Sequence, residues 1–224
     1  MNKIDVLNDG FVRLVDSMGG DVAVVRSARV SYGDETKGED ADRKLIHYLL
    51  KHNHGTPFEH LIFTFHIRCP IFIARQWFRH RIGSFNEISL RYTEYGDSEF
   101  WIPDEWRTNN ESNKQSSGEA NFSDEINEEF FEAYAVVLEH AKECYRYLLD
   151  SGVAREQARA VLPLATYTEF YWTVNARSLF NFIRLRAAPD AQQEMQEYAK
   201  VISQIAEAEA PWTWEAFNRP SNKG

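Results

Sequence analysis

The stretch from Arg79 to Tyr92 holds a dense group of side chains that could do chemistry. It reads Arg-His-Arg-Ile-Gly-Ser-Phe-Asn-Glu-Ile-Ser-Leu-Arg-Tyr. Burying so many polar groups is costly unless other groups pair with them. Arginine offers a planar fork of donors that fits phosphates and carboxylates, and the amide, carboxylate and hydroxyl groups supply the donors and acceptors that a heterocycle requires. The stretch therefore predicts a segment that binds an anion and a base.

Three further stretches carry polar side chains that could join the same site. They cover residues 54–59, 155–159 and 175–186. In the last stretch, Arg177 and Asn181 stand four positions apart, so a helix there presents both on one face. The alternative is that these arginines lie in solvated surface ion pairs. Because Arg79 and Arg81 lie close to Trp77 in the sequence, simple solvation is the weaker interpretation, and we favour a ligand site.

Several common enzyme classes do not fit the sequence. There is no glycine-rich phosphate loop, since Gly83 stands alone in its stretch. Ser84 and Ser89 lack the flanking glycines of a nucleophile elbow. Cys69 precedes a proline and Cys144 lies within an expected helix, so a cysteine nucleophile is not expected. We expect both thiols to be small buried hydrophobic groups.

The charge and composition of the chain limit its partners. A net charge of −9 over 224 residues argues against general adhesion to nucleic acid or to an anionic membrane. Arginine nevertheless makes up 17 of the 25 basic residues, and many of these arginines fall in clusters, which suits small anionic ligands such as nucleotides. The apolar runs are too short for a membrane span and the amino terminus lacks the apolar core of a signal peptide, so we expect a soluble cytoplasmic protein.

The histidines suggest one alternative activity. His52, His54 and His60, with His66 and Glu59, could form a metal site such as that of a metal-dependent hydrolase. Their spacing matches no helical histidine-pair signature, so we expect no metal site.

A second alternative is an RNA-binding module that uses the aromatic and arginine residues of segment 77–92. The acidic total charge opposes an RNA-binding function.

His80 stands between two arginines, whose like charge disfavours protonation, so we expect its imidazole to be neutral.

Patterns of apolar residues predict both helices and strands, and no repeat or change of composition marks a second domain. Helices are expected at residues 21–29, 40–51, 70–77, 123–152, 154–162, 175–186 and 191–209. Strands are expected before residue 21 and at residues 61–68, 88–92 and 166–174. Residues 33–39 and 108–121 are expected to be loops, the second of them mobile. Trp212, Trp214 and Phe217 are expected to pack the carboxyl-terminal segment against the body.

The alternation of apolar and polar residues from Leu61 to Arg68 predicts a half-buried strand. Ser123 and Asn175 are typical helix N-caps. The helix that begins at Ser123 carries apolar residues at steps of three or four, as is typical of an amphipathic helix. These residues are Ile126, Phe130, Tyr134, Val137, Ala141, Tyr145 and Leu148.

The motif Arg79-His80-Arg81, followed by seven residues and Ser89, resembles the signature of the flavin-dependent thymidylate synthases. The likeness extends in order over almost the whole chain. It includes His-Gly-Thr-Pro-Phe-Glu-His at 54–60, Ala-Arg-Gln-Trp-Phe at 74–78, Ala-Arg-Ala-Val-Leu-Pro at 158–163 and Asn-Ala-Arg-Ser-Leu at 175–179.

The resemblance implies an activity and an assembly. The activity is reductive methylation of dUMP to dTMP, with 5,10-methylenetetrahydrofolate as carbon donor, FAD as redox carrier and NADPH as reductant. The implied fold is α+β, with an antiparallel sheet flanked by helices in a single domain over residues 1–224. The implied assembly is a homotetramer whose subunits share active sites.

The resemblance also implies roles for individual residues. FAD would contact Thr56, Arg79, His80, Arg81, Glu87, Asn175, Arg177 and Asn181. The nucleotide dUMP would contact Gln76, Arg79, Glu87, Ser89, Arg91, Arg159 and Arg186. Two residues would be catalytic: Arg186, beside the pyrimidine, where a guanidinium favours ionisation at N3, and His54, near the folate and the flavin. Ser89 would bind substrate through its hydroxyl and would not act as a nucleophile.

Overall fold

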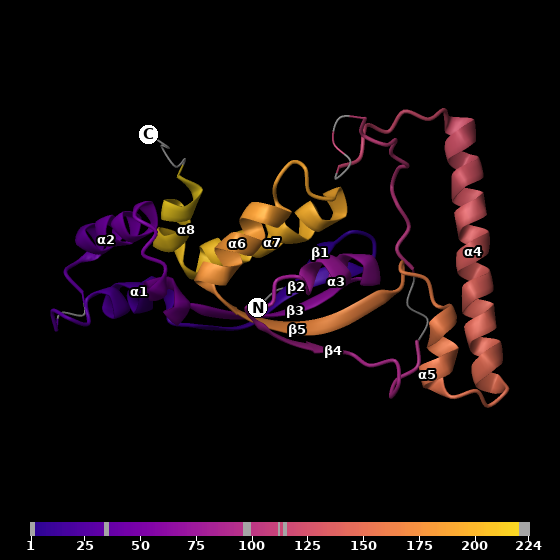
Figure 1. Cartoon of the computed structure of the whole chain (residues 1–224), viewed down its shortest axis with the longest axis horizontal. Helices are drawn as coiled ribbons and strands as arrows, with labels where there is room; N and C mark the ends of the chain where they lie inside the picture. The colour runs from indigo at the N-terminus through magenta and orange to yellow at the C-terminus, as the bar shows by residue number, and fades with distance from the viewer. Residues whose placement is uncertain (1–2, 34–35, 96–99, 112, 114–115, 220–224) are drawn as a thin grey trace.

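A five-stranded antiparallel sheet lies at the centre of the computed structural model, which describes residues 3–33, 36–95, 100–111, 113 and 116–219 (Figure 1). In order across the sheet, the strands are β1 (Lys3–Val6), β2 (Gly10–Met18), β3 (Ile62–Pro70), β5 (Tyr167–Asn175) and β4 (Ser84–Glu87). The helices are α1 (Gly20–Ala28), α2 (Glu39–Lys51), α3 (Ile71–Trp77), α4 (Asp124–Asp150), α5 (Arg155–Ala158), α6 (Ala176–Arg186), α7 (Gln193–Glu209) and α8 (Pro211–Asn218), with 3-10 turns η1 (Thr56–His60) and η2 (Arg159–Val161). The α+β fold predicted from the motifs is confirmed.

Strand β3 forms the middle of the sheet because β2 and β5 pair with it on either side. Phe63, Phe65 and Ile67 have no exposed surface, as their alternation predicted, and burying each side chain contributes about 1.5–3 kcal/mol. Thr64 and His66 alternate with them and keep part of their surface exposed. The alternation along β3 therefore decides which face of the sheet the helices cover.

Helices α3, α6 and α7 meet around the indole of Trp77. Its ring centroid lies 5.5 Å from that of Trp172 on β5, 4.9 Å from that of Phe182 on α6 and 5.9 Å from that of Tyr198 on α7. Figure 1 shows these helices over one face of the sheet, with α1, α2 and α8 gathered at one end. The aromatic core thus holds α3 and α6, whose ends carry the polar stretches, in a fixed relation.

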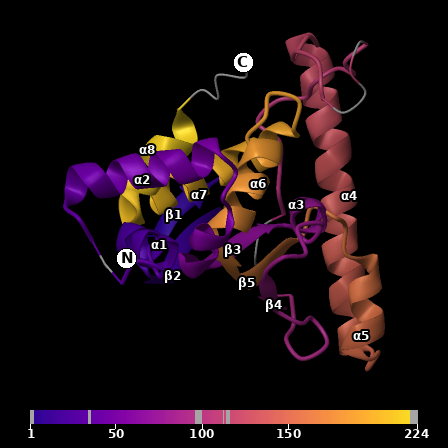
Figure 2. The ribbon, with the colours of Figure 1, turned by 60° about the vertical axis from the view of Figure 1, so that its left-hand side comes forward.

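Helix α4 stands at the far side of the molecule from α1 and α2 in both views (Figures 1 and 2). Ser123 caps it as predicted, because its Oγ accepts a hydrogen bond from the amide of Ile126 at 3.4 Å. The helix packs against the segment that follows residue 100. There the hydroxyl of Tyr134 donates to the carbonyl of Trp101 at 3.0 Å, and the ring centroid of Tyr134 lies 5.4 Å from that of Trp106.

The apolar stripe of α4 is only partly buried. Tyr145 is buried, but Val137 is 59% exposed. Cys144 is also exposed, so its predicted burial was wrong. The reason is that α4 packs on a loop and on α5 at this point and not on the sheet. None of the described helices is both long enough and apolar enough to cross a membrane.

One further prediction about the elements needs correction. The strand predicted at residues 88–92 was wrong, since the strand is Ser84–Glu87 and the chain turns after it. The carbonyl of Ser89 accepts hydrogen bonds from the amides of Tyr92 and Thr93, at 3.0 and 3.1 Å, and this turn overrides the β propensity of the apolar residues around it. The tail after residue 210 forms helix α8, for which no prediction was made. Trp214 is fully buried on it, and Trp212 and Phe217 pack against the core, so the predicted packing of the tail is confirmed.

The segment at residues 108–121 was predicted to be a mobile loop. Among its described residues, Asn109 and Ser117 form an isolated antiparallel bridge. Residues 112, 114 and 115 lie outside the described part of the chain. The mobility of the segment stays a prediction.

Candidate functional site

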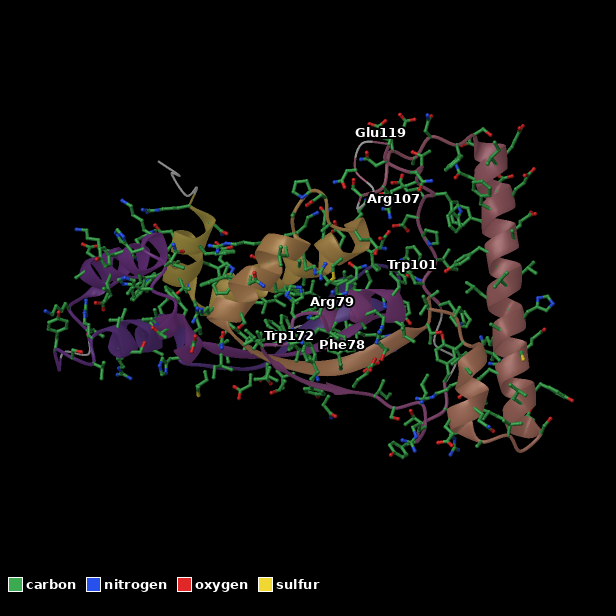
Figure 3. The ribbon with its side chains drawn as sticks, viewed as in Figure 1. Phe78, Arg79, Trp101, Arg107, Glu119 and Trp172 are labelled. Carbon is green, nitrogen blue, oxygen red and sulfur yellow. The ribbon has the colours of Figure 1, made fainter. Side chains whose placement is uncertain are left out.

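A cavity of about 460 Å³ runs along α6 and is called the α6 cavity. Six residues predicted for the site line it: Arg79, His80, Arg81, Arg177, Asn181 and Arg186. Trp172 on β5 also lines it, and Figure 3 shows Trp172 near Arg79 in the middle of the molecule. Residues from the loop after α3 therefore meet residues of α6, which lie about one hundred positions later in the chain.

Asn175 sets the start of α6 and so the direction of its side chains. Its Oδ1 accepts a hydrogen bond from the amide of Ser178 at 2.9 Å, which is the predicted N-cap. Arg177 and Asn181 then lie on one face, and both line the α6 cavity. Arg177 also forms an ion pair with Glu59 at the surface, and such an exposed pair contributes little to stability.

Arg186, at the end of α6, holds two groups of the segment around α3. Its Nε donates to Nε2 of His80 at 2.9 Å, and its Nη2 donates to the carbonyl oxygen of Gln76 at 3.0 Å. Burial, and then the positive charge of Arg79, lower the pKa of Arg186 from its ordinary value. The guanidinium nevertheless stays charged at neutral pH, because the intrinsic pKa of arginine is so high.

His80 is neutral in this arrangement. Because Nε2 accepts from Arg186, the ring proton lies on Nδ1. Burial and, as a smaller cause, the charge of Arg186 lower the pKa of His80 to about 4. A neutral His80 was predicted, but the physical cause differs. Burial dominates, and the nearby cation is Arg186, in place of the sequence neighbours Arg79 and Arg81.

The side chain of Gln76 belongs to a chain of hydrogen bonds that leads away from Arg186. Its Nε2 donates to Oε1 of Gln192, and Nε2 of Gln192 donates to Glu194 at 2.8 Å. Glu194 is buried and also accepts from Arg107, which Figure 3 labels. A carboxylate accepts hydrogen bonds, so the amide nitrogen of Gln192 faces Glu194 and its amide oxygen faces Gln76. The amide nitrogen of Gln76 therefore faces Gln192.

A second cavity, of about 580 Å³, lies beside α3 and is called the α3 cavity. Glu87 and Arg159, both predicted to bind the nucleotide, line it together with Arg75 and Thr168. The hydroxyl of Thr168 donates to Oε1 of Glu87 at 2.7 Å. The predicted nucleotide residues are therefore divided within one chain. Glu87 and Arg159 line the α3 cavity, whereas Arg79 and Arg186 line the α6 cavity.

Ser89 and Arg91 lie in the turn after β4, next to two residues that line the α3 cavity, Ile88 and Leu90. The Oγ of Ser89 accepts from the amide of Arg91 at 3.3 Å. Arg91 approaches Glu156 at 3.4 Å. Ser89 and Arg91 thus lie at the edge of the α3 cavity. The turn that carries them is stabilised by the hydrogen bonds of Ser89.

His54 lies in a smaller cavity of about 220 Å³ that adjoins the α6 cavity, because Arg177 and Asn181 line both. Thr56 begins η1 directly after it. A Cβ at position 55 would meet Nε of Arg177 at 2.8 Å, so Gly55 allows the guanidinium stem to lie against the loop. His54 is therefore brought towards α6, where it lines its own small cavity, and its place near the folate and the flavin stays a prediction.

The histidine cluster considered for a metal does not assemble. Across the described residues, no group of three or more histidine, cysteine, aspartate or glutamate side chains is placed to hold a metal ion. The rings of His52 and His54 lie 6.2 Å apart and pack around Tyr48. These contacts are those of an aromatic cluster.

The sequence model of the family described as thymidylate synthase complementing protein matches residues 13–212. A flavin-dependent thymidylate synthase of Thermosipho africanus is 52% identical over 98% of this chain and 95% of that protein. The chain belongs to the flavin-dependent thymidylate synthase family. One from Thermus thermophilus is 50% identical over 96% of this chain and 77% of that protein. A solved structure of the UMP/dUMP methylase PolB from Streptomyces cacaoi, bound with 5-Br dUMP, has a TM-score of 0.84 and 39% identity, and covers 96% of this chain and 97% of that one.

The motifs by which the chain resembles the flavin-dependent thymidylate synthases frame both cavities. Segment 74–78 supplies lining of the α3 cavity, and segment 175–179 begins α6. Sequence reasoning assigned no role to Thr168 or Arg75. The bond from Thr168 to Glu87 crosses between strands, so no spacing in the sequence signals it, whereas Arg75 stood within a recognised motif.

Proposed function

We propose that this chain methylates dUMP to dTMP as one domain over residues 1–224, with 5,10-methylenetetrahydrofolate as carbon donor, FAD as redox carrier and NADPH as reductant. The observation that carries the proposal is the α6 cavity, where six predicted site residues from two distant segments converge, a neutral His80 among them. Family membership supports the reaction class.

The residues of the α6 cavity fit a flavin dinucleotide. Among the described residues, Arg79 and Arg81 have no carboxylate partner, so their guanidinium groups are available for phosphate oxygens. The N-terminus of α6 adds partial positive charge. The residues that would hold FAD are Thr56, Arg79, His80, Arg81, Glu87, Asn175, Arg177 and Asn181. FAD, when bound, supplies the redox step.

The hydrogen bonds of Asn175 and His80 limit what each can offer to a ligand. The Oδ1 of Asn175 is occupied by the helix cap, which leaves its Nδ2 to donate. His80 accepts from Arg186 through Nε2, which leaves its Nδ1–H to donate. Both residues therefore present donors, as the acceptor-rich phosphates of a dinucleotide require.

For the nucleotide, we propose a site assembled from two subunits of a homotetramer. The motif residues for dUMP lie in two cavities of one chain, so a second copy can bring the Glu87 and Arg159 group to the Arg79 and Arg186 group. Exposed apolar residues support subunit contacts, among them Val137 on α4 and Ile82 at the α6 cavity.

Arg186 is the proposed electrostatic catalyst. Its Nε and Nη2 already donate to His80 and Gln76, which fixes the plane of the guanidinium and leaves Nη1 to face the pyrimidine. A permanent cation at that place stabilises negative charge at N3 and so makes C5 more nucleophilic. Because His80 is neutral, it supports Arg186 without adding a second positive charge.

The test combines a spectrum with turnover. Purified protein, with FAD added if needed, is expected to show a flavin absorbance spectrum that dUMP perturbs. It should then form dTMP when methylenetetrahydrofolate and NADPH are supplied. UMP is assayed in parallel, because the PolB neighbour is described as a UMP/dUMP methylase. Protein that takes up no flavin would end the proposal, and turnover of UMP alone would change its substrate.

A further inference from the structure

The α3 cavity contains both acidic and basic side chains, and the acidic ones are already bonded. Among the carboxylates that line it, Glu94 accepts from Arg155 at 2.7 Å and Glu156 approaches Arg91 at 3.4 Å. Glu87 accepts from the Thr168 hydroxyl.

The fourth carboxylate, Glu169, contacts one guanidinium and one imidazole. It contacts Nη1 of Arg68 at 3.1 Å and Nε2 of His66 at 3.0 Å. Arg68 also pairs with Asp9, so Glu169 and Asp9 share one guanidinium. Glu94 and Glu156 each have an arginine partner of their own.

Two arginines of the same cavity have no ionic partner among the described residues. Within the described part of the chain, neither Arg75 nor Arg159 has an ion pair or a side-chain hydrogen bond. Two guanidinium groups at this cavity are therefore uncommitted, and guanidinium groups bind phosphate through charge-assisted hydrogen bonds. Glu87, whose partner is a neutral hydroxyl, lines the same cavity.

The fold keeps these two arginines at the same cavity. Arg75 lies in the last turn of α3, and Arg159 begins η2. The first residues of α3 are tied to the segment that follows η2. The amide of Ile71 donates to the carbonyl of Thr166 at 2.9 Å, and the amide of Phe72 donates to that of Leu164 at 3.2 Å. The backbone around the two guanidinium groups is therefore fixed before a ligand binds.

We propose that Arg75 is a second ligand of the nucleotide's 5′-phosphate and acts together with Arg159. This inference rests on the proposed function. Two planar guanidinium groups can each bind a phosphate through paired hydrogen bonds. Glu87 lines the same cavity with a charge that repels phosphate, so the phosphate lies towards the arginines and Glu87 accepts from a donor on the sugar or base.

The test measures how tightly the variant Arg75→Gln binds two ligands, dUMP and deoxyuridine. Its dissociation constant for dUMP, measured by calorimetry, is expected to rise about 10-fold or more, because a charge-assisted hydrogen bond is lost. The dissociation constant for deoxyuridine, which lacks the phosphate, should stay within about twofold, since each lost interaction affects only its own group. Arg75→Lys keeps the charge without the fork and should fall between wild type and Arg75→Gln.

The double variant Glu94→Gln/Arg155→Gln is the matched control. It removes an arginine close to the same cavity together with the carboxylate that it neutralises, so no lining carboxylate loses its partner. Its dUMP affinity should stay near that of wild type. Because Arg75 is exposed and has no described partner, Arg75→Gln should unfold at the wild-type temperature.

Three results would overturn the inference. They are an unchanged dUMP affinity in Arg75→Gln, an equal loss for dUMP and deoxyuridine, and an equal loss of dUMP affinity in Glu94→Gln/Arg155→Gln. Wild-type protein that binds no dUMP would instead remove the proposed function, so the two failures are distinguishable.

Discussion

The Nε of Arg186 donates to Nε2 of His80 over 2.9 Å, and this single bond fixes the protonation state of His80. A protonated imidazole has no acceptor, so the bond exists only while His80 is neutral. Burial also disfavours the charged ring, because it removes the water that would solvate the charge. The site therefore carries one permanent cation at this pair, supported by a neutral acceptor.

We predict that His80 stays neutral as the pH falls from 6.5 and gains its proton only near pH 4. Since the unfolded state binds that proton at about pH 6.5, the stabilisation from neutral His80 is complete above pH 6.5 and is lost as the pH falls towards 4. Urea unfolding of ligand-free protein across this range measures it. His80→Gln, which cannot titrate, should show a shallower loss, and an equal slope in both proteins would contradict the prediction.

Arg186→Ala should nearly abolish dTMP formation, by about 100-fold or more in kcat, while flavin stays bound. The physical reason is the loss of the cation that stabilises charge at N3. Turnover and the flavin spectrum are measured on the same sample. Arg186→Lys restores charge but not the bonds to His80 and Gln76, and should recover only part of the rate. Loss of flavin together with the fold would refute this role.

Arg159→Ala should chiefly weaken the binding of dUMP, by about 10-fold, because a guanidinium without another described partner is removed from the α3 cavity. A titration with dUMP measures the affinity, and flavin content serves as the control. An unchanged titration would count against a phosphate role for Arg159.

The sequence predicted most of the elements that position the site. The alternation in β3 and the caps at Ser123 and Asn175 are local patterns, and local patterns survive folding when burial agrees with them. The predicted strand at 88–92 failed because Ser89 closes a turn there.

Non-local features were harder to predict. The exposure of Cys144 depends on where α4 docks, and the bond from Thr168 to Glu87 depends on strand pairing between distant segments. The division of the motif residues between two cavities is likewise a property of the folded chain. Motif spacing can say which residues bind a ligand, but not which of them meet within one subunit.

Asn175→Ala should lower the free energy of unfolding by about 1 kcal/mol, because the amide of Ser178 loses its cap. Chemical denaturation of flavin-free protein measures this loss separately from any effect on the cofactor. Asn175→Asp keeps the acceptor and should retain most of the stability. If both variants lost the same stability, the cap would not be the cause.

Mixing two defective variants tests whether subunits share the nucleotide site. Arg159 and Arg186 line different cavities of one chain, so a shared site takes one of them from each subunit. Arg159→Ala and Arg186→Ala are unfolded together and refolded as a mixture, then assayed at a dUMP concentration where each alone is inactive. Random pairing restores both arginines at about a quarter of the sites, so activity should return to roughly that fraction of wild type. A mixture as inactive as its parents would place both arginines of each site in the same chain. A conformational change would then be needed to bring the two cavities of that chain together.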